Sequence, residues 1–138
     1  MLARKRNVIA VLAALMVLAA VPGWAMADAI YLLRLRPTMY EPCASGQVEW
    51  GYETRLRPPH IHTLFHVAVQ DVLSTDLVEV RINGVPLDQL ISLTDGHGEL
   101  SLDSDWGDDP PWLDPGHLVE IYDAYDRTTL LLWGVVDE

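Results

Sequence analysis

Polar and apolar residues alternate with a period of two along most of the chain after residue 27. Between residues 77 and 83, for example, Val78, Val80 and Ile82 share one face, and Glu79 and Arg81 share the other. This alternation predicts strands with one buried face. No window of about ten residues holds a clean helical period, so helices are not expected.

Glycine, proline, asparagine and aspartate separate the alternating runs at intervals of about 8–12 residues, which is typical of turns between short strands. Strands are expected over residues 30–36, 44–55, 60–70, 77–83, 98–103, 117–123 and 129–136. Residues 85–93 fit either a short helical turn or an edge strand, and residues 104–116 predict a loop rich in proline and aspartate. About seven strands predict an all-β fold, namely an antiparallel, Ig-like β-sandwich.

The stretch Arg57-Pro58-Pro59 separates two of the longest runs and predicts a β-hairpin. If the two strands pair symmetrically about this stretch, Trp50 lies opposite Phe65 on an apolar face. A shift by one residue would place apolar residues opposite polar ones along the whole ladder, so the register is well defined. The other face then carries the pairs Glu49–His66, Gly51–Leu64, Glu53–His62 and Arg55–His60.

Residues 1–27 have the three parts of a cleavable secretory signal peptide. Three cations at residues 4–6 precede an apolar run over residues 8–20, and Ala25-Met26-Ala27 supplies small residues for a signal peptidase. We expect cleavage before Asp28; cleavage after Ala29 and an uncleaved anchor are the alternatives. The run is shorter than the roughly 18 residues of a spanning helix. Residues 28–138 are therefore expected to be one periplasmic or extracellular domain without membrane insertion.

The expected exported domain is strongly acidic. All 20 Asp and Glu residues follow residue 27, and three of the nine Lys and Arg residues precede it, which leaves a formal net charge of −14. This charge argues against nucleic acid and anionic membranes as partners, because both are polyanions. It suits cations, basic partners or simply solubility. No lysine follows residue 27, which excludes Schiff-base chemistry by this domain.

Motifs that mark catalysis are missing from the sequence. It contains no Gly-x-Ser-x-Gly, His-Glu-x-x-His, Cys-x-x-Cys or glycine-rich phosphate loop. Cys43 is the only cysteine, so an internal disulfide is excluded, and we interpret it as a structural thiol. The chain is therefore interpreted as a non-enzymatic binding or interaction module with an unidentified protein or cell-surface partner and no cofactor.

The strongest candidate for a binding site is His60-Ile61-His62. Residues i and i+2 of a strand point the same way, about 7 Å apart, and can offer two imidazoles to one metal. The hairpin register adds Glu53, and two histidines with a carboxylate suit Zn²⁺ or Cu²⁺ with an open position. His66 lies about 13 Å along the strand and cannot join without a bulge. The competing interpretation is a solvated polar face with weak Glu–His pairs.

Two further candidates lie after residue 102. The segment 103–109 is rich in aspartate, and such loops can bind Ca²⁺. Its spacing fails the EF-hand pattern, because Asp108 stands where glycine is required, so a solvated turn is favoured. Trp106 and Trp112 form the candidate interaction patch, for a sugar or a partner protein. The tryptophans on expected strands are assigned to the core.

Strand and turn motifs follow one another in a recognisable order from Ala44 to Val135. They are Ala44-Ser45-Gly46, Phe65-x-Val67-x-Val69, Val78-x-Val80-x-Ile82-Asn83-Gly84, Gly98-Glu99-Leu100-Ser101-Leu102, Gly107-Asp108-Asp109-Pro110, Pro115-Gly116 and Leu130-Leu131-Leu132-Trp133-Gly134-Val135. This order resembles small exported bacterial Ig-like β-sandwich modules of unassigned function. The resemblance implies the fold and the exported compartment, and no catalytic residue. Those modules tend to have small polar residues where this chain has His60, His62 and His66, so a periplasmic Cu- or Zn-binding protein is the alternative function.

Overall fold

The structure of the chain, a computed structural model, describes residues 25–137. Among these residues there is no α-helix, and no helix is long and apolar enough to cross a membrane. The elements are β1 (Ala25–Pro37), β2 (Ser45–Leu56), β3 (Pro59–Gln70), β4 (Leu77–Ile82), β5 (Val85–Pro86), β6 (Ile91–Ser92), β7 (Gly98–Asp103), the short 3-10 helix η2 (Ser104–Trp106), β8 (Leu118–Asp123) and β9 (Leu130–Val135). Most of the expected signal peptide lies outside the described residues.

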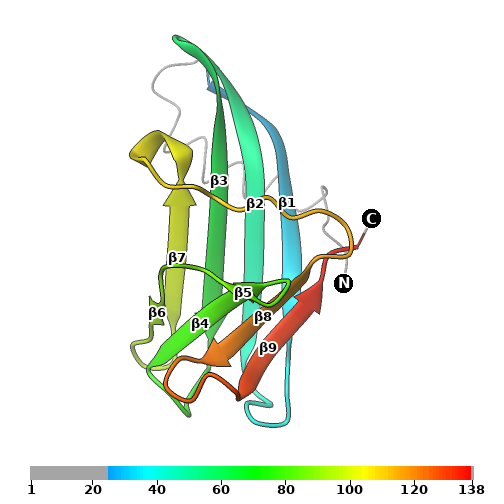
Figure 1. Cartoon of the computed structure of the whole chain (residues 1–138), viewed down its shortest axis with the longest axis vertical. Helices are drawn as coiled ribbons and strands as arrows, with labels where there is room; N and C mark the ends of the chain where they lie inside the picture. Colours follow the sequence, from blue (N-terminus) through cyan, green and yellow to red (C-terminus); the bar gives the residue numbers. More distant parts are fainter. Residues whose placement is uncertain (1–24, 138) are drawn as a thin grey trace.

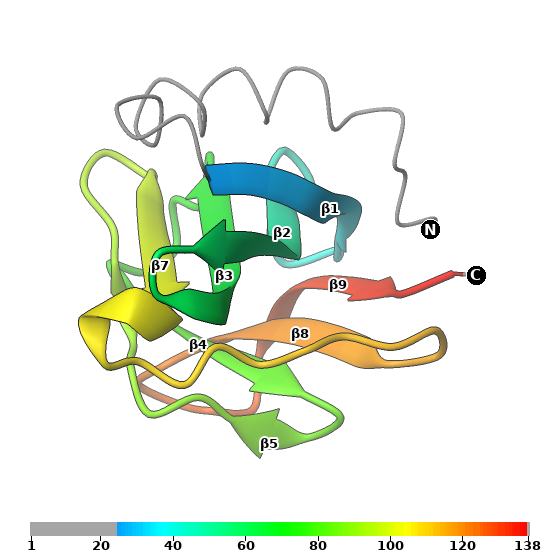
Figure 2. The same ribbon diagram turned by 90° about the horizontal axis from the view of Figure 1, so that it is seen from above.

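The strands form one antiparallel sheet with the order β5-β4-β8-β9-β1-β2-β3-β7, and β6 pairs with β4. The sheet curls into a half-barrel, in which β4, β8 and β9 cross in front of the lower parts of β1, β2 and β3 (Figure 1). Seen from above, these strands form two facing layers (Figure 2). β1 joins the layers, because most of it pairs with β2 whereas Arg36 and Pro37 pair with Trp133 and Leu132 of β9.

The expected all-β, antiparallel class is confirmed. The Ig-like sandwich arrangement is not, because β1, β2 and β3 follow one another as a meander within one layer, and one continuous hydrogen-bonded order joins both layers. Residues 25–137 form nine strands, where about seven were expected. The additional two, β5 and β6, are short strands within residues 85–93. Of the two alternatives for this stretch, the structure therefore shows strand pairing and no helical turn.

β1 begins at Ala25, before its expected start at residue 30 and across the expected cleavage site. The β1–β2 register is interrupted between Ala27 and Ala29. Cleavage before Asp28 would therefore remove only the short part of β1 that precedes this irregularity. The pairs from Ala29–Tyr52 onward lie after the expected cleavage site and would remain; the cleavage site itself stays a prediction.

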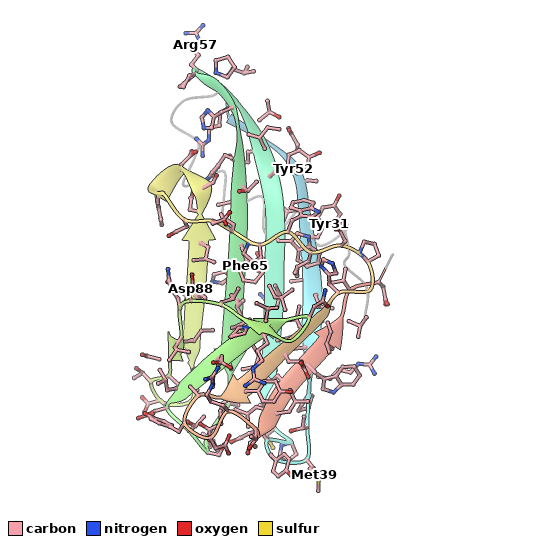
Figure 3. All side chains as sticks on the ribbon, in the orientation of Figure 1. Tyr31, Met39, Tyr52, Arg57, Phe65 and Asp88 are labelled. Carbon is pink, nitrogen blue, oxygen red and sulfur yellow. The ribbon has the colours of Figure 1, made fainter. Side chains whose placement is uncertain are left out.

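The β2–β3 hairpin has the predicted register. Trp50 lies opposite Phe65, and Glu53 lies opposite His62. Arg57 marks the tip of this long hairpin, far from the second layer (Figure 3). The side chains of Trp50 and Phe65 are fully buried, so a one-residue shift would exchange them for polar neighbours and lose their burial.

The hydrophobic core lies between the two layers. Trp50 and Phe65 project into it from one layer, and Val80 and Ile121 project from the other. The upper parts of β1–β3 extend beyond the second layer, and the segment that follows η2 crosses in front of them (Figure 1). Leu113 of this segment is buried in the same core, so the loop extends the cover above the second layer.

Candidate functional site

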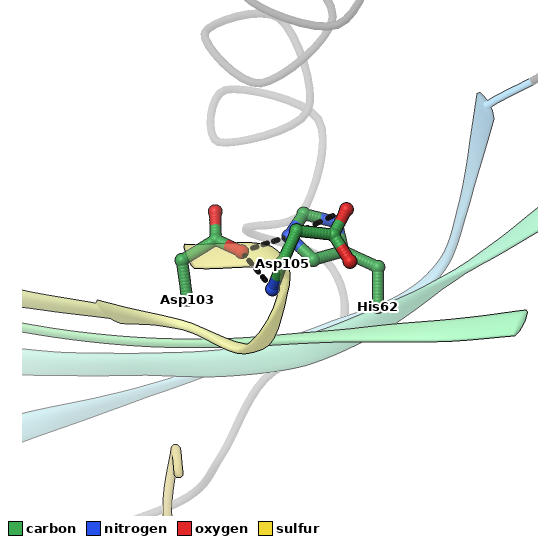
Figure 4. Close-up of side chains that lie close together, drawn as sticks. All are labelled: His62, Asp103 and Asp105. Atoms are coloured by element: carbon green, nitrogen blue, oxygen red, sulfur yellow. Dashed lines mark hydrogen bonds and ion pairs between the residues drawn. The ribbon is translucent and has the colours of Figure 1, made fainter. Parts of the chain in front are cut away.

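The densest cluster of ionisable side chains near the predicted histidines lies where β7 ends beside β3. β3 pairs with β7 from Val69–Gly98 to Leu64–Asp103. Asp103 ends β7 and caps η2, because its Oδ1 accepts a hydrogen bond of 2.9 Å from the backbone N–H of Asp105. This turn brings both carboxylates to the imidazole of His62 (Figure 4).

Both ring nitrogens of His62 are engaged. Nε2 lies 2.5 Å from Oδ1 of Asp103, and Nδ1 lies 2.8 Å from NH2 of Arg55. A guanidinium only donates hydrogen bonds, so Nδ1 is the acceptor. The proton of the neutral imidazole is then on Nε2 and is donated to Asp103. His62 is 3% exposed, so these two partners take the place of solvent.

Arg55 is the cation at the centre of the cluster. Its NH2 lies 3.4 Å from Oε2 of Glu53, and its Nε lies 3.3 Å from Oδ2 of Asp105. Two carboxylates therefore contact the guanidinium and a third, that of Asp103, contacts His62, which gives the cluster a formal charge of −2 when His62 is neutral. The Oε2 atom of Glu53 is buried and, among the described residues, accepts no hydrogen bond. It lies 3.5 Å from Nδ1 of His62.

The structure places the predicted residues at different distances from this cluster. It brings Glu53 and His62 together, as the register requires. His60 contacts the cluster through Asp105, with its Nε2 3.0 Å from Oδ1 of that residue. Its Nδ1 lies 2.7 Å from the carbonyl oxygen of Pro58, and this bond, followed by the one to Asp105, raises the pKa of His60 above its usual value. His66 pairs separately with Glu99 at 3.2 Å.

The competing interpretation predicts a solvated polar face on the hairpin, but the structure shows that only part of this face is solvated. His66 is half-buried and its partner Glu99 is exposed, as that interpretation expects. Glu53 and His62, however, are each only 3% exposed. Asp103, Asp105 and Arg55 occupy the positions that water would take at a solvated face. Burial also raises the pKa of Glu49, on the same face.

His62, Asp103 and Asp105 each offer a ligand atom, and these atoms lie within 4.8 Å of one another. Ligands of a tetrahedral Zn²⁺ at about 2.0–2.2 Å stand about 3.3–3.6 Å apart. The observed distances from Nε2 of His62 are 2.5 Å to Oδ1 of Asp103 and 3.9 Å to Oδ2 of Asp105. Movements of about 1 Å or less along these two distances would therefore match that spacing.

The two tryptophans of the predicted interaction patch have different surroundings. Trp112 packs against Tyr31 and Tyr52, with ring centroids 6.0 and 5.9 Å apart, and these tyrosines line the upper part of the sheet (Figure 3). Trp106, in η2, is 77% exposed. Trp112 thus covers the end of the core with one side of its ring while 41% of the residue stays exposed, whereas Trp106 presents an open ring to solvent.

The remaining candidates of the sequence have clear structural positions. Asp108 accepts a hydrogen bond from the backbone N–H of Asp103, which supports the expectation of a turn over residues 103–109. Cys43 lies exposed in the loop between β1 and β2, so it is not a packed core thiol.

Comparison of the chain with protein-family models, with curated proteins and with solved structures found no match. The sequence contained both halves of the cluster, His-x-His and the aspartate-rich segment. It gave no sign that β3 and β7 pair and bring the two halves together.

Proposed function

We propose that this chain is an exported protein that binds a divalent transition metal through His62, Asp103 and Asp105. The observation that carries the proposal is the convergence of one imidazole and two carboxylates in a cluster with a formal charge of −2. A divalent cation would neutralise this charge. The buried Oε2 atom of Glu53 accepts no hydrogen bond among the described residues and has only an ion pair of 3.4 Å with Arg55, so this carboxylate can still accept a hydrogen bond from a further donor.

The donor set favours Zn²⁺ or Cu²⁺ over Ca²⁺. Imidazole nitrogen suits Zn²⁺ and Cu²⁺, whereas Ca²⁺ takes six to eight oxygen ligands. Three protein ligands leave one position of a tetrahedral site open for water or for a ligand from a partner. The proposal therefore describes a binding protein, and a periplasmic or extracellular location follows from the signal peptide expected at residues 1–27.

A second proposal, the non-enzymatic interaction module, is supported by the exposed indole of Trp106. An open aromatic ring beside carboxylates suits a sugar or a protein partner. This proposal includes the relationship to exported Ig-like modules, which the two facing layers favour. An interaction module should keep its stability and its binding when a chelator is added, whereas a metal-binding protein should lose the stability that its metal contributes.

The test uses protein expressed from the full chain without a histidine tag. Intact mass gives the processed N-terminus, which we expect at Asp28. Thermal melts in EDTA are compared with melts in Zn²⁺, Cu²⁺ and Ca²⁺, because a ligand that binds only the native state raises the melting temperature. We expect a rise with Zn²⁺ or Cu²⁺ and none with Ca²⁺.

The variants Asp105→Asn and His62→Ala should lose the rise, and His66→Ala, a histidine of the same strand outside the cluster, should keep it. Asp105 is exposed, so its variant should fold even if the His62 variant does not. An unchanged melting temperature with both transition metals, or the same rise in Asp105→Asn, would refute the metal proposal and leave the interaction module.

A further inference from the structure

We infer that Arg55 and Glu53 form an exchange switch that controls access of the metal to His62. In the metal-free state the guanidinium of Arg55 holds Nδ1 of His62, and in the metal-bound state the carboxylate of Glu53 replaces it. The inference rests on the proposed metal site, and it concerns the regulation of that site.

The first step follows from the hydrogen bonds of His62. Its Nε2 carries the proton that is donated to Asp103, and its Nδ1 accepts from Arg55. A metal that binds between His62, Asp103 and Asp105 needs the lone pair of Nε2. The neutral ring must then lose the proton at Nε2 to solvent and gain one from solvent at Nδ1. The charge of the ring is the same before and after this exchange.

The second step follows from the new role of Nδ1. Once protonated, Nδ1 is a donor, and it faces NH2 of Arg55, another donor, at only 2.8 Å. Two donors cannot share this contact. The guanidinium must therefore withdraw. The side chain of Arg55 is 19% exposed and lies near the end of β2, where Leu56 and the hairpin tip are exposed, so a path to solvent is short.

The third step identifies the acceptor that replaces Arg55. Glu53 lies directly opposite His62 in the β2–β3 register, and its Oε2 is 3.5 Å from Nδ1. This oxygen is buried, accepts no hydrogen bond among the described residues, and is ion-paired at 3.4 Å with Arg55, so withdrawal of the guanidinium frees it to accept from Nδ1. A metal-binding histidine usually donates its other N–H to a carboxylate, which fixes the tautomer and orients the ring. Glu53 is thus a positioning residue for the bound state.

The switch predicts opposite effects for its two members. Glu53→Gln should weaken Zn²⁺ binding by about 10–100-fold, because it replaces the orienting carboxylate by a neutral amide. Arg55→Met should strengthen it, because the competing cation and its hydrogen bond to Nδ1 are both removed. Glu49→Gln is the matched control: it lies on the same strand and face but pairs with His66, and should leave the affinity unchanged.

The experiment combines calorimetric titration with Zn²⁺ and long-range ¹H–¹⁵N correlation spectra of His62. We expect protonated Nε2 without metal and protonated Nδ1 with Zn²⁺, together with the opposed affinity changes. If the wild-type protein does not bind Zn²⁺, the proposed function fails. If it binds through His62 but Glu53→Gln and Arg55→Met bind as tightly as wild type, or the ring proton stays on Nε2, the switch is refuted and the metal site stands. The spectra decide the question even if a variant does not fold.

Discussion

Replacement of His62 by alanine tests whether the cluster is a buried network or a solvated face. A solvated histidine should cost almost nothing to remove. In the structure, however, the change deletes the hydrogen bond from Nε2 to Asp103 and the one from Arg55 to Nδ1. Both join the ring to charged groups, and the side chain of His62 is only 4% exposed.

The magnitude can be estimated from these two bonds. A hydrogen bond to a charged group contributes about 1.5–3 kcal/mol to stability, and leaving a buried partner unsatisfied would cost more. Asp103 keeps the bond from the N–H of Asp105, and Arg55 keeps its contact with Glu53, so neither partner is left bare. We therefore expect His62→Ala to lower the free energy of unfolding by about 3–5 kcal/mol.

The matched control is His66→Ala. His66 also pairs with a carboxylate across the β3–β7 boundary, but its side chain is 30% exposed and that of Glu99 is 71% exposed. An exposed pair of this kind contributes about 0–1 kcal/mol. Urea unfolding of both variants in EDTA, followed by tryptophan fluorescence, measures the difference without a contribution from metal. Costs below about 1 kcal/mol for both variants would refute a buried network at His62.

Three further predictions concern the framework around the site. Trp50→Ala should cost about 3–5 kcal/mol in urea unfolding, and a neutral result would contradict the burial of this ring. Gly51→Ala should prevent folding or strongly destabilise the protein, because the added Cβ would overlap the carbonyl oxygen of Ala29; Gly84→Ala, whose Cβ meets no atom within 4 Å, should cost only about 1 kcal/mol of backbone strain. The pKa of Asp126 is lowered, first by the Thr129 hydroxyl, so its stabilisation is complete above the unfolded pKa near 3.8 and is lost as the pH falls through the lower folded value. The melting temperatures of wild type and Asp126→Ala should therefore converge on acidification; a constant difference down to pH 2 would contradict this.

Much of the fold was predictable because the signals are local. The alternation around Trp50 and Phe65 defines a register, and the prolines at the hairpin tip define its centre. The short strands β5 and β6 were ambiguous for the opposite reason. Only a couple of residues pair in each, too few to display a period of two.

The site was only half predictable, because its halves meet through a long-range pairing. His62 and Glu53 are neighbours through the hairpin, which the sequence pattern predicts. Asp103 and Asp105 reach His62 only because β7 pairs with β3 after the chain has passed through the second layer. Arg55 was expected beside His60 from the register, and the bend of its side chain toward His62 depends on the charges around it.

The seam between β1 and β9 joins the beginning of the described chain to its end. Arg36 and Pro37 find their partners only at Trp133 and Leu132, almost a hundred residues later. The β1–β9 seam therefore cannot form while the C-terminal segment is still being synthesised. A chain with this order of strands can pair β1, β2, β3 and β7 early, but its second layer joins the first only when its last strand has formed.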